Sequence, residues 1–126
     1  MITQYDEQIR VRYQETDAMG RVHHASFFTY FEIGRTELLR VTGQTYRQFE
    51  ERGLMLVVTE ISCRYFAPAL YDDLLTVRTT TAAAKGARIE HSYIVLRGDT
   101  LLADGRSVVA CVDRTGKARR LPPSLF

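Results

Sequence analysis

The amino-acid sequence predicts an α+β fold in which an antiparallel sheet of about five strands wraps around one long central helix. Residues 25–43 repeat their apolar side chains at helical spacing. The segments 5–13 and 54–113 are rich in strand-forming residues, and short glycine-containing turns divide the second of them. One amphipathic helix and several antiparallel strands bury their apolar faces best when the sheet covers the helix.

Length and composition restrict the class of protein. The 126 residues are expected to form a single domain, residues 1–126, of ordinary globular composition. The net charge of +2 suits an anionic ligand but is too small to predict a nucleic-acid partner. There is no signal-peptide pattern, and no apolar run approaches the ~18 residues of a membrane span. We therefore expect a cytoplasmic protein in which Cys63 and Cys111, which lack metal or redox spacing, are reduced core thiols.

The first strand is predicted over residues 5–13, where apolar and polar side chains alternate. The residues expected to face inward are Tyr5, Ile9, Val11 and Tyr13. A loop over residues 14–24 follows and leads into the long helix.

The long helix is predicted over residues 25–43. Its apolar face comprises Phe27, Phe31, Gly34, Leu38 and Val41. Glycine costs about 1 kcal/mol relative to alanine inside a helix, so Gly34 predicts a close approach of this face to the sheet. On the helix surface, Glu32 is expected to pair with Arg35, and Glu37 with Arg40, at i,i+3 spacing.

The rest of the chain is predicted to be a short helix and four long strands in hairpin order. The helix covers residues 45–53, and the strands cover 54–66, 73–84, 87–97 and 100–113. Lys85-Gly86 and Gly98-Asp99 are expected to be turns. The tail after residue 113 is basic and then proline-containing, and we predict no structure for its end.

The stretch YQETDAMGRVHHASFFTYFE, residues 13–32, combines the features of an acyl-hydrolysis site. A helix N-terminus presents unsatisfied N–H groups and a partial positive charge, which can stabilise an oxyanion. The carboxylate of Asp17 can attack an acyl carbon or remove a proton from water. Gly20 allows a sharp turn or the close approach of a substrate.

Structural explanations exist for the same residues. Asp17 can serve only as a turn residue, and Glu15 is the other carboxylate, which we expect to be exposed to solvent. His23 and His24 suggest a metal, but adjacent side chains diverge in regular structure and no third ligand has suitable spacing, so no metal site is predicted. One of these histidines can orient substrate or water, or simply pack. Ser26 is a candidate helix cap.

The stretch VRYQETDAMGRVHHASFFTYFEIGRTELLR resembles the signature of the 4-hydroxybenzoyl-CoA thioesterase family, the hotdog-fold acyl-CoA thioesterases. The matching positions are Asp17, Gly20, Val22, His23-His24, Phe31-Glu32, Gly34-Arg35, Glu37, Leu39 and Arg40. The segment CRYFAPALYDDLLTV is also similar to the family's next segment. Many members have asparagine at the position of Ser26 and tyrosine at that of Phe27.

The resemblance implies a hotdog fold and subunits that pair edge to edge as a homodimer or homotetramer, with the active site at the dimer interface. It implies that Asp17 is the catalytic carboxylate, as nucleophile or general base, and that the backbone N–H of His24 is the oxyanion donor. Gly20, His23 and Ala25 would contact the substrate. An acyl-CoA would be hydrolysed without a metal or organic cofactor, and basic residues would lie near the CoA phosphates. Candidates for these phosphate contacts are Arg64, Lys85, Arg88 and the cluster from Arg114 to Arg120.

Two other functions remain open at this stage. A hotdog hydratase or dehydratase needs a histidine beside a carboxylate, which His23 with Asp17 or Glu37 can supply. Glu37 points away from the predicted buried face, which weakens that alternative. A non-catalytic acyl-CoA-binding module is the second alternative, although binding alone does not require Asp17.

Overall fold

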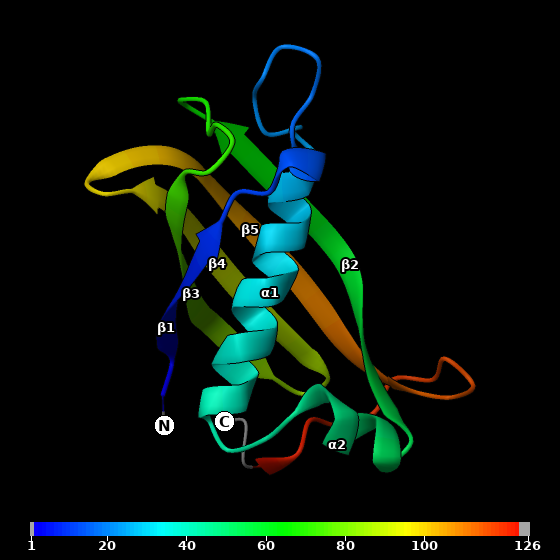
Figure 1. Ribbon diagram of the computed structural model, residues 1–126. Helices are drawn as coiled ribbons and strands as arrows, with labels where there is room; N and C mark the ends of the chain where they lie inside the picture. The colour runs from blue at the N-terminus through cyan, green and yellow to red at the C-terminus, as the bar shows by residue number, and fades with distance from the viewer. Residues whose placement is uncertain (1, 124–126) are drawn as a thin grey trace.

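In the computed structural model, residues 2–123 form a five-stranded antiparallel sheet that curves around a long helix (Figure 1). In chain order the elements are β1 (Gln4–Arg10), a 3-10 turn η1 (Tyr13–Glu15), α1 (Ser26–Val41), α2 (Tyr46–Glu51), β2 (Leu54–Tyr65), β3 (Leu74–Lys85), β4 (Arg88–Arg97) and β5 (Thr100–Asp113). The predicted α+β class is therefore confirmed.

The order of the strands in the sheet is β1-β3-β4-β5-β2. The predicted hairpins at Gly86 and Gly98 are present, but the predicted hairpin between β2 and β3 is wrong. β2 pairs with β5 at one edge of the sheet, and residues 66–73 carry the chain across to β3. A connection of this length does not hold two consecutive strands side by side as a two-residue turn does. β1 and β2 are consequently the two edge strands.

Helix α1 packs against the sheet through its apolar face, and Gly34 lies at the closest approach. A Cβ atom at this position would collide with Thr79 Oγ1 and would lie 3.1 Å from Val77 Cγ1. One turn earlier, the ring of Phe31 stacks on that of Tyr93 with centroids 4.3 Å apart. The predicted reason for a glycine in the helix interior is confirmed.

The two ion pairs predicted on α1 have different outcomes. Glu37 and Arg40 form theirs, with Oε2 and Nε 3.1 Å apart. Glu32 and Arg35 do not, because Arg35 buries its Nη1 atom instead of extending along the helix surface. The shorter helix α2 begins at a capping box in which Thr45 Oγ1 accepts from the backbone N–H of Gln48.

The first strand is shorter than predicted. β1 ends at Arg10, opposite the first residue of β3, and the chain then turns into η1. Tyr13 is therefore 76% exposed and packs edge-on against Tyr71, so its predicted inward orientation is wrong. Inward orientation holds for Val11, which is fully buried.

The C-terminal segment folds back over the lower end of the sheet (Figure 1). Leu121 is buried with Phe49 of α2, and residues 124–126 lie outside the described residues. Of the two free cysteines, Cys111 is buried as predicted, whereas Cys63 is only partly buried. No helix within residues 2–123 is long and apolar enough to cross a membrane.

Candidate active site

The loop that carries Asp17 is a closed turn at the N-terminal end of α1 (Figure 1). Thr16 and Val22 pair as an isolated bridge at its base. Within the turn, the Asp17 N–H donates to the Arg21 carbonyl at 2.7 Å, and the Gly20 N–H donates to the Asp17 carbonyl at 3.0 Å. Gly20 has φ of 78°, a conformation that glycine adopts without strain. Its role is thus to shape the turn around Asp17.

The Asp17 carboxylate uses one of its two oxygens to stabilise this turn. Oδ1 accepts from the backbone N–H groups of Met19 at 2.9 Å and Arg21 at 3.3 Å. The turn-residue explanation is therefore correct, but it accounts for only half of the carboxylate. Oδ2 accepts no hydrogen bond from any residue in the described part of the chain, and the side chain is only partly buried. This oxygen is free to meet a substrate or water.

The backbone N–H of His24 is likewise unpaired within residues 2–123, whereas those on either side of it are bonded. The His23 N–H donates to the Glu15 carbonyl at 2.8 Å, and the Ala25 N–H donates to His23 Nδ1 at 3.1 Å. The His23 carbonyl accepts from the Ser26 N–H at 2.9 Å. Because the C=O and N–H of a trans peptide point in opposite directions, the His24 N–H points away from the helix. It lies at the positive end of the α1 dipole.

Tyr65, the last residue of β2, holds this loop from the other side. Its hydroxyl donates to the His24 carbonyl at 2.8 Å, and its ring packs edge-on against Phe27. Burial is the main cause that raises the pKa of Tyr65 to about 12, so the hydroxyl keeps its proton for this bond. Sequence reasoning missed Tyr65, because nothing local connects it to a loop 41 residues earlier.

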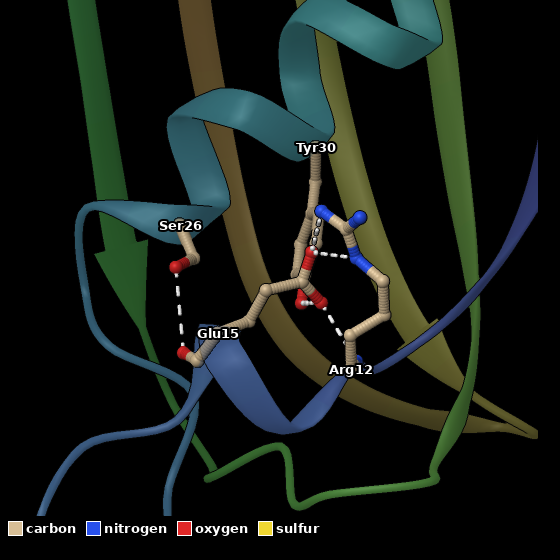
Figure 2. Close-up of polar contacts among 4 residues, drawn as sticks. All are labelled: Arg12, Glu15, Ser26 and Tyr30. Carbon is tan, nitrogen blue, oxygen red and sulfur yellow. Dashed lines mark hydrogen bonds and ion pairs between the residues drawn. The ribbon is translucent and has the colours of Figure 1, made fainter.

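Glu15 is the main correction to the predicted site. It was expected to be exposed, but it is 8% exposed and lies beneath the loop among Arg12, Ser26 and Tyr30 (Figure 2). Its Oε1 accepts from the Tyr30 hydroxyl at 2.9 Å, and its Oε2 accepts from Arg12 Nη2 at 3.0 Å. Burial, and next this carboxylate, raise the pKa of Tyr30 well above its usual range. Glu15 is thus a structural carboxylate that fastens the loop to α1.

Ser26 does not cap the helix, so that prediction is also wrong. Ala25 is the N-cap residue and makes no side-chain cap bond. The Ser26 hydroxyl instead donates to the Glu15 carbonyl at 3.4 Å (Figure 2). The hydrogen bond from Ser26 to Glu15 therefore joins the helix to the loop.

The two histidines do not diverge as expected, because they lie in a loop and not in regular structure. The rings of His23 and His24 stack with centroids 4.2 Å apart. No group of three or more His, Cys, Asp or Glu side chains among residues 2–123 is arranged to hold a metal. Over the same range, no hydrogen bond joins His23 to Asp17 or Glu37, and Glu37 is engaged with Arg40. Within residues 2–123, these histidine–carboxylate pairs therefore do not form the hydrogen bond that a hydratase mechanism would use.

Several of the basic residues considered for phosphate binding are already paired. Arg64 forms a two-pronged ion pair with Asp104, at 2.9 and 2.8 Å, and Arg119 pairs with Asp113 at 2.8 Å. Lys85 and Arg88 are exposed at the turn between β3 and β4.

Comparison with known proteins agrees with this fold. A family model described as a thioesterase-like superfamily matches residues 11–125. The acyl-CoA thioesterase YbgC of Haemophilus influenzae is 40% identical over 106 residues, which cover 83% of this chain and 78% of that protein. The acyl-CoA thioester hydrolase YbgC of Escherichia coli is 35% identical over 124 residues, covering 93% and 89%.

Solved structures show the same architecture. A probable thioesterase from Bartonella henselae superposes with a TM-score of 0.91 at 35% identity, covering 94% of this chain and 99% of that one. A DHNA-CoA thioesterase from Staphylococcus aureus gives a TM-score of 0.91 at 27% identity, covering 94% and 80%. With a family model that spans nearly the whole chain, and relatives of this identity and coverage, the chain belongs to the thioesterase-like superfamily and has its hotdog fold.

Proposed function

We propose that this protein hydrolyses acyl-CoA thioesters with Asp17 as the reactive carboxylate and the His24 N–H as the oxyanion donor. The protein is a thioester hydrolase by family, and the proposal concerns the substrate and the residues that act. The observation that carries it is a pair of groups in one loop, Asp17 Oδ2 and the His24 N–H, that have no hydrogen-bond partner in the described part of the chain. The other oxygen of Asp17 and the N–H groups of His23 and Ala25 are all bonded, so an acceptor and a donor of the kind that the reaction needs stay unpaired within residues 2–123.

The reaction would use these groups in one of two ways. As a general base, Asp17 would take a proton from water while the hydroxide oxygen bonds to the thioester carbon. As a nucleophile, Asp17 would form an acyl anhydride that water then opens. In both cases the carbonyl oxygen becomes negative and accepts from the His24 N–H, and the C–S bond breaks to release the CoA thiolate and leave a carboxylic acid.

Acyl-CoA is proposed as the substrate because two curated relatives carry that activity in their names. The partly buried Asp17 and the exposed His24 lie at the molecular surface, where the large CoA group can stay in solvent while the thioester reaches the loop. His23, Gly20 and Ala25 remain proposed substrate contacts, since all three are exposed in the segment that follows Asp17. The predicted cytoplasmic location remains a prediction.

The test is release of free thiol from a panel of short, medium, long and aromatic acyl-CoAs. We expect Asp17→Asn to lower kcat by about a thousandfold while the circular dichroism spectrum is unchanged. The matched control is Asp99→Asn, an exposed aspartate in the turn between β4 and β5, which should keep full activity. Near-native turnover in Asp17→Asn would refute the assignment.

A single turnover in ¹⁸O-labelled water separates the two roles of Asp17. Label appearing in the Asp17 side chain would identify the nucleophilic route, because water then attacks the anhydride through its enzyme carbonyl. Label confined to the released acid would exclude attack at the enzyme carbonyl, and trapping of an acyl-enzyme would then separate the general-base route from an anhydride opened at its acyl carbonyl. If the whole panel is inactive, hydration of an enoyl-CoA, followed by loss of its ultraviolet absorbance, and simple acyl-CoA binding are the next measurements.

We further propose that two chains pair through β2. This edge strand is 12 residues long, and its Val57 and Val58 are 40% and 45% exposed. A long apolar edge strand exposes unpaired N–H and C=O groups and favours addition of another strand. Sedimentation should give a dimer or tetramer for the wild type and a monomer for Val57→Lys/Val58→Lys. A monomeric wild type, or a variant of unchanged mass, would contradict the pairing.

A further inference from the structure

A separate cavity of about 320 Å³ lies between the C-terminal half of α1 and the sheet. Its apolar walls come from α1 and from strands β2, β4 and β5. These apolar residues are Leu38, Leu39, Leu56, Ile89 and Val109. None of residues 17–25 lines it. At 1.5 Å per residue, Arg35 lies roughly 14 Å along the helix from Ser26, so this cavity is distinct from the Asp17 loop.

Two nitrogen-bearing side chains also line this cavity, and each has one buried nitrogen that no atom within residues 2–123 satisfies. Arg35 Nη1 and His91 Nδ1 are both buried and have no hydrogen-bond partner within residues 2–123. His91 as a whole is only 6% exposed. Buried polar atoms without a partner are uncommon in folded proteins, and each one costs free energy.

The charge of Arg35 is also uncompensated. Within the described part of the chain no carboxylate forms an ion pair with it, although Glu32 lines the same cavity one turn earlier on α1. A partly desolvated guanidinium without an anion is unfavourable. Water can satisfy its N–H groups, but only an anion neutralises its charge.

We propose that this cavity binds a small molecule that joins an apolar body to a carboxylate, with Arg35 as the anion-binding residue and His91 as a second donor. A carboxylate matches the planar guanidinium and accepts two hydrogen bonds from it. The apolar walls accept a hydrocarbon chain or an aromatic ring. The volume lies at the lower end of the ~300–1,000 Å³ typical of small-molecule sites.

The state of His91 agrees with this role. Burial, and next the charge of Arg35, lower the pKa of His91 to about 4, so the ring is neutral at physiological pH. A neutral imidazole carries one N–H, and Nδ1–H is a donor when the proton is on that atom. The ring therefore offers a hydrogen bond to a carboxylate without adding a second charge.

Such a carboxylate has two possible sources. One is a free carboxylic acid that binds independently of catalysis. The other is the far end of an acyl group that carries its own carboxylate, held while the thioester is at Asp17. The second source rests on the proposed function, whereas the first does not.

The experiment is calorimetric titration of the wild-type protein with octanoate and octanamide, and with benzoate and benzamide. We expect at least one acid to bind ten times more tightly than its amide, which has the same shape but no charge. Arg35→Met should remove this preference. The control is Arg40→Met on the same helix, whose side chain pairs with Glu37 outside the cavity and which should keep the preference.

Two further measurements separate the sources. Asp17→Asn should bind the free acid as the wild type does, so a failure of the thioesterase mechanism leaves this result intact. Thiol release is then compared between octanoyl-CoA and the CoA monothioester of an eight-carbon dicarboxylic acid. A preference for the second substrate that Arg35→Met abolishes would identify the acyl end as the source.

The proposal is overturned if amides bind as tightly as acids, if Arg35→Met keeps the preference, or if no acid binds. If Arg35→Met does not fold, the proposal is tested on the wild-type protein by NMR. Titration with the acids must then shift the NMR signals of the His91 ring while those of His23 and His24 stay fixed. Unmoved His91 signals would overturn the proposal.

Discussion

The two ends of α1 differ in where their unpaired polar groups lie. At the N-terminal end, Glu15 accepts from Tyr30, and Asp17 Oδ2 and the His24 N–H, which have no partner within residues 2–123, lie in a loop that is partly open to solvent. In the C-terminal half, the unpaired nitrogens of Arg35 and His91 are buried beside a cavity. The first arrangement favours reaction at the surface, and the second favours enclosure of a ligand.

The largest expected effect comes from removing the anchor of the N-terminal end. Glu15→Ala leaves the buried Tyr30 hydroxyl without an acceptor and breaks the pair with Arg12. We expect the free energy of unfolding to fall by about 3–4 kcal/mol, measured by urea titration. Glu37→Ala, which breaks the exposed pair with Arg40, should cost less than about 1 kcal/mol. Equal costs would show that burial does not distinguish the two carboxylates.

The next effect concerns the C-terminal half and depends on pH. His91 faces Arg35 from α1, Thr81 and Ser107 from the neighbouring strands, and Tyr93 along its own strand. Its pKa is about 4 in the folded protein and ~6.5 when unfolded. The unfolded state therefore binds more protons between these values, and the stability present above pH 6.5 is lost as the pH falls towards 4.

The free energy of unfolding should fall by roughly 3 kcal/mol over this pH range because of His91. The His91→Gln variant has no titrating ring at this position and should not show this loss. The difference between the free energies of unfolding of wild type and variant, measured against pH, therefore separates the effect of the histidine from that of the carboxylates. Parallel curves from pH 7 to pH 4 would contradict the burial of a neutral His91.

How far the sequence predicts this molecule depends on the range of the interactions involved. The long helix, the close approach at Gly34 and the two real hairpins were predicted because apolar spacing and turn residues are local signals. Glu15 was misplaced because its partner Tyr30 is 15 residues away on another element. The burial of the Arg35 Nη1 atom beside the cavity could not be predicted for a similar reason. The i,i+3 spacing from Glu32 indicates only an ion pair on the helix surface. Asp17, Gly20 and His24 can be proposed from the sequence because they lie within eight positions of one another.

The smallest expected effect tests the turn around Asp17. Gly20→Ala forces a Cβ atom into the left-handed conformation and should cost about 1 kcal/mol of stability. Because this turn sets the direction of the Asp17 carboxylate, kcat should also fall. Gly86→Ala imposes the same strain in the turn between β3 and β4, and should lower stability without changing kcat. Equal kcat in both variants would mean that the turn geometry does not direct Asp17.

The strand order has a consequence for how the chain reaches its native state. β1 pairs with β3, so Gln4 meets Thr80, and β2 pairs with β5, so Leu54 meets Asp113. Half of the strand partnerships thus join residues far apart in the chain, and such contacts must close long loops before they gain stability. Helix α1 can form early from local contacts, but its apolar face is covered only when the strands of the sheet pack against it. Folding in milliseconds to seconds is expected for this topology. Both the Asp17 loop, which Tyr65 of β2 holds, and the cavity, which Val109 of β5 lines, depend on these late strand pairings.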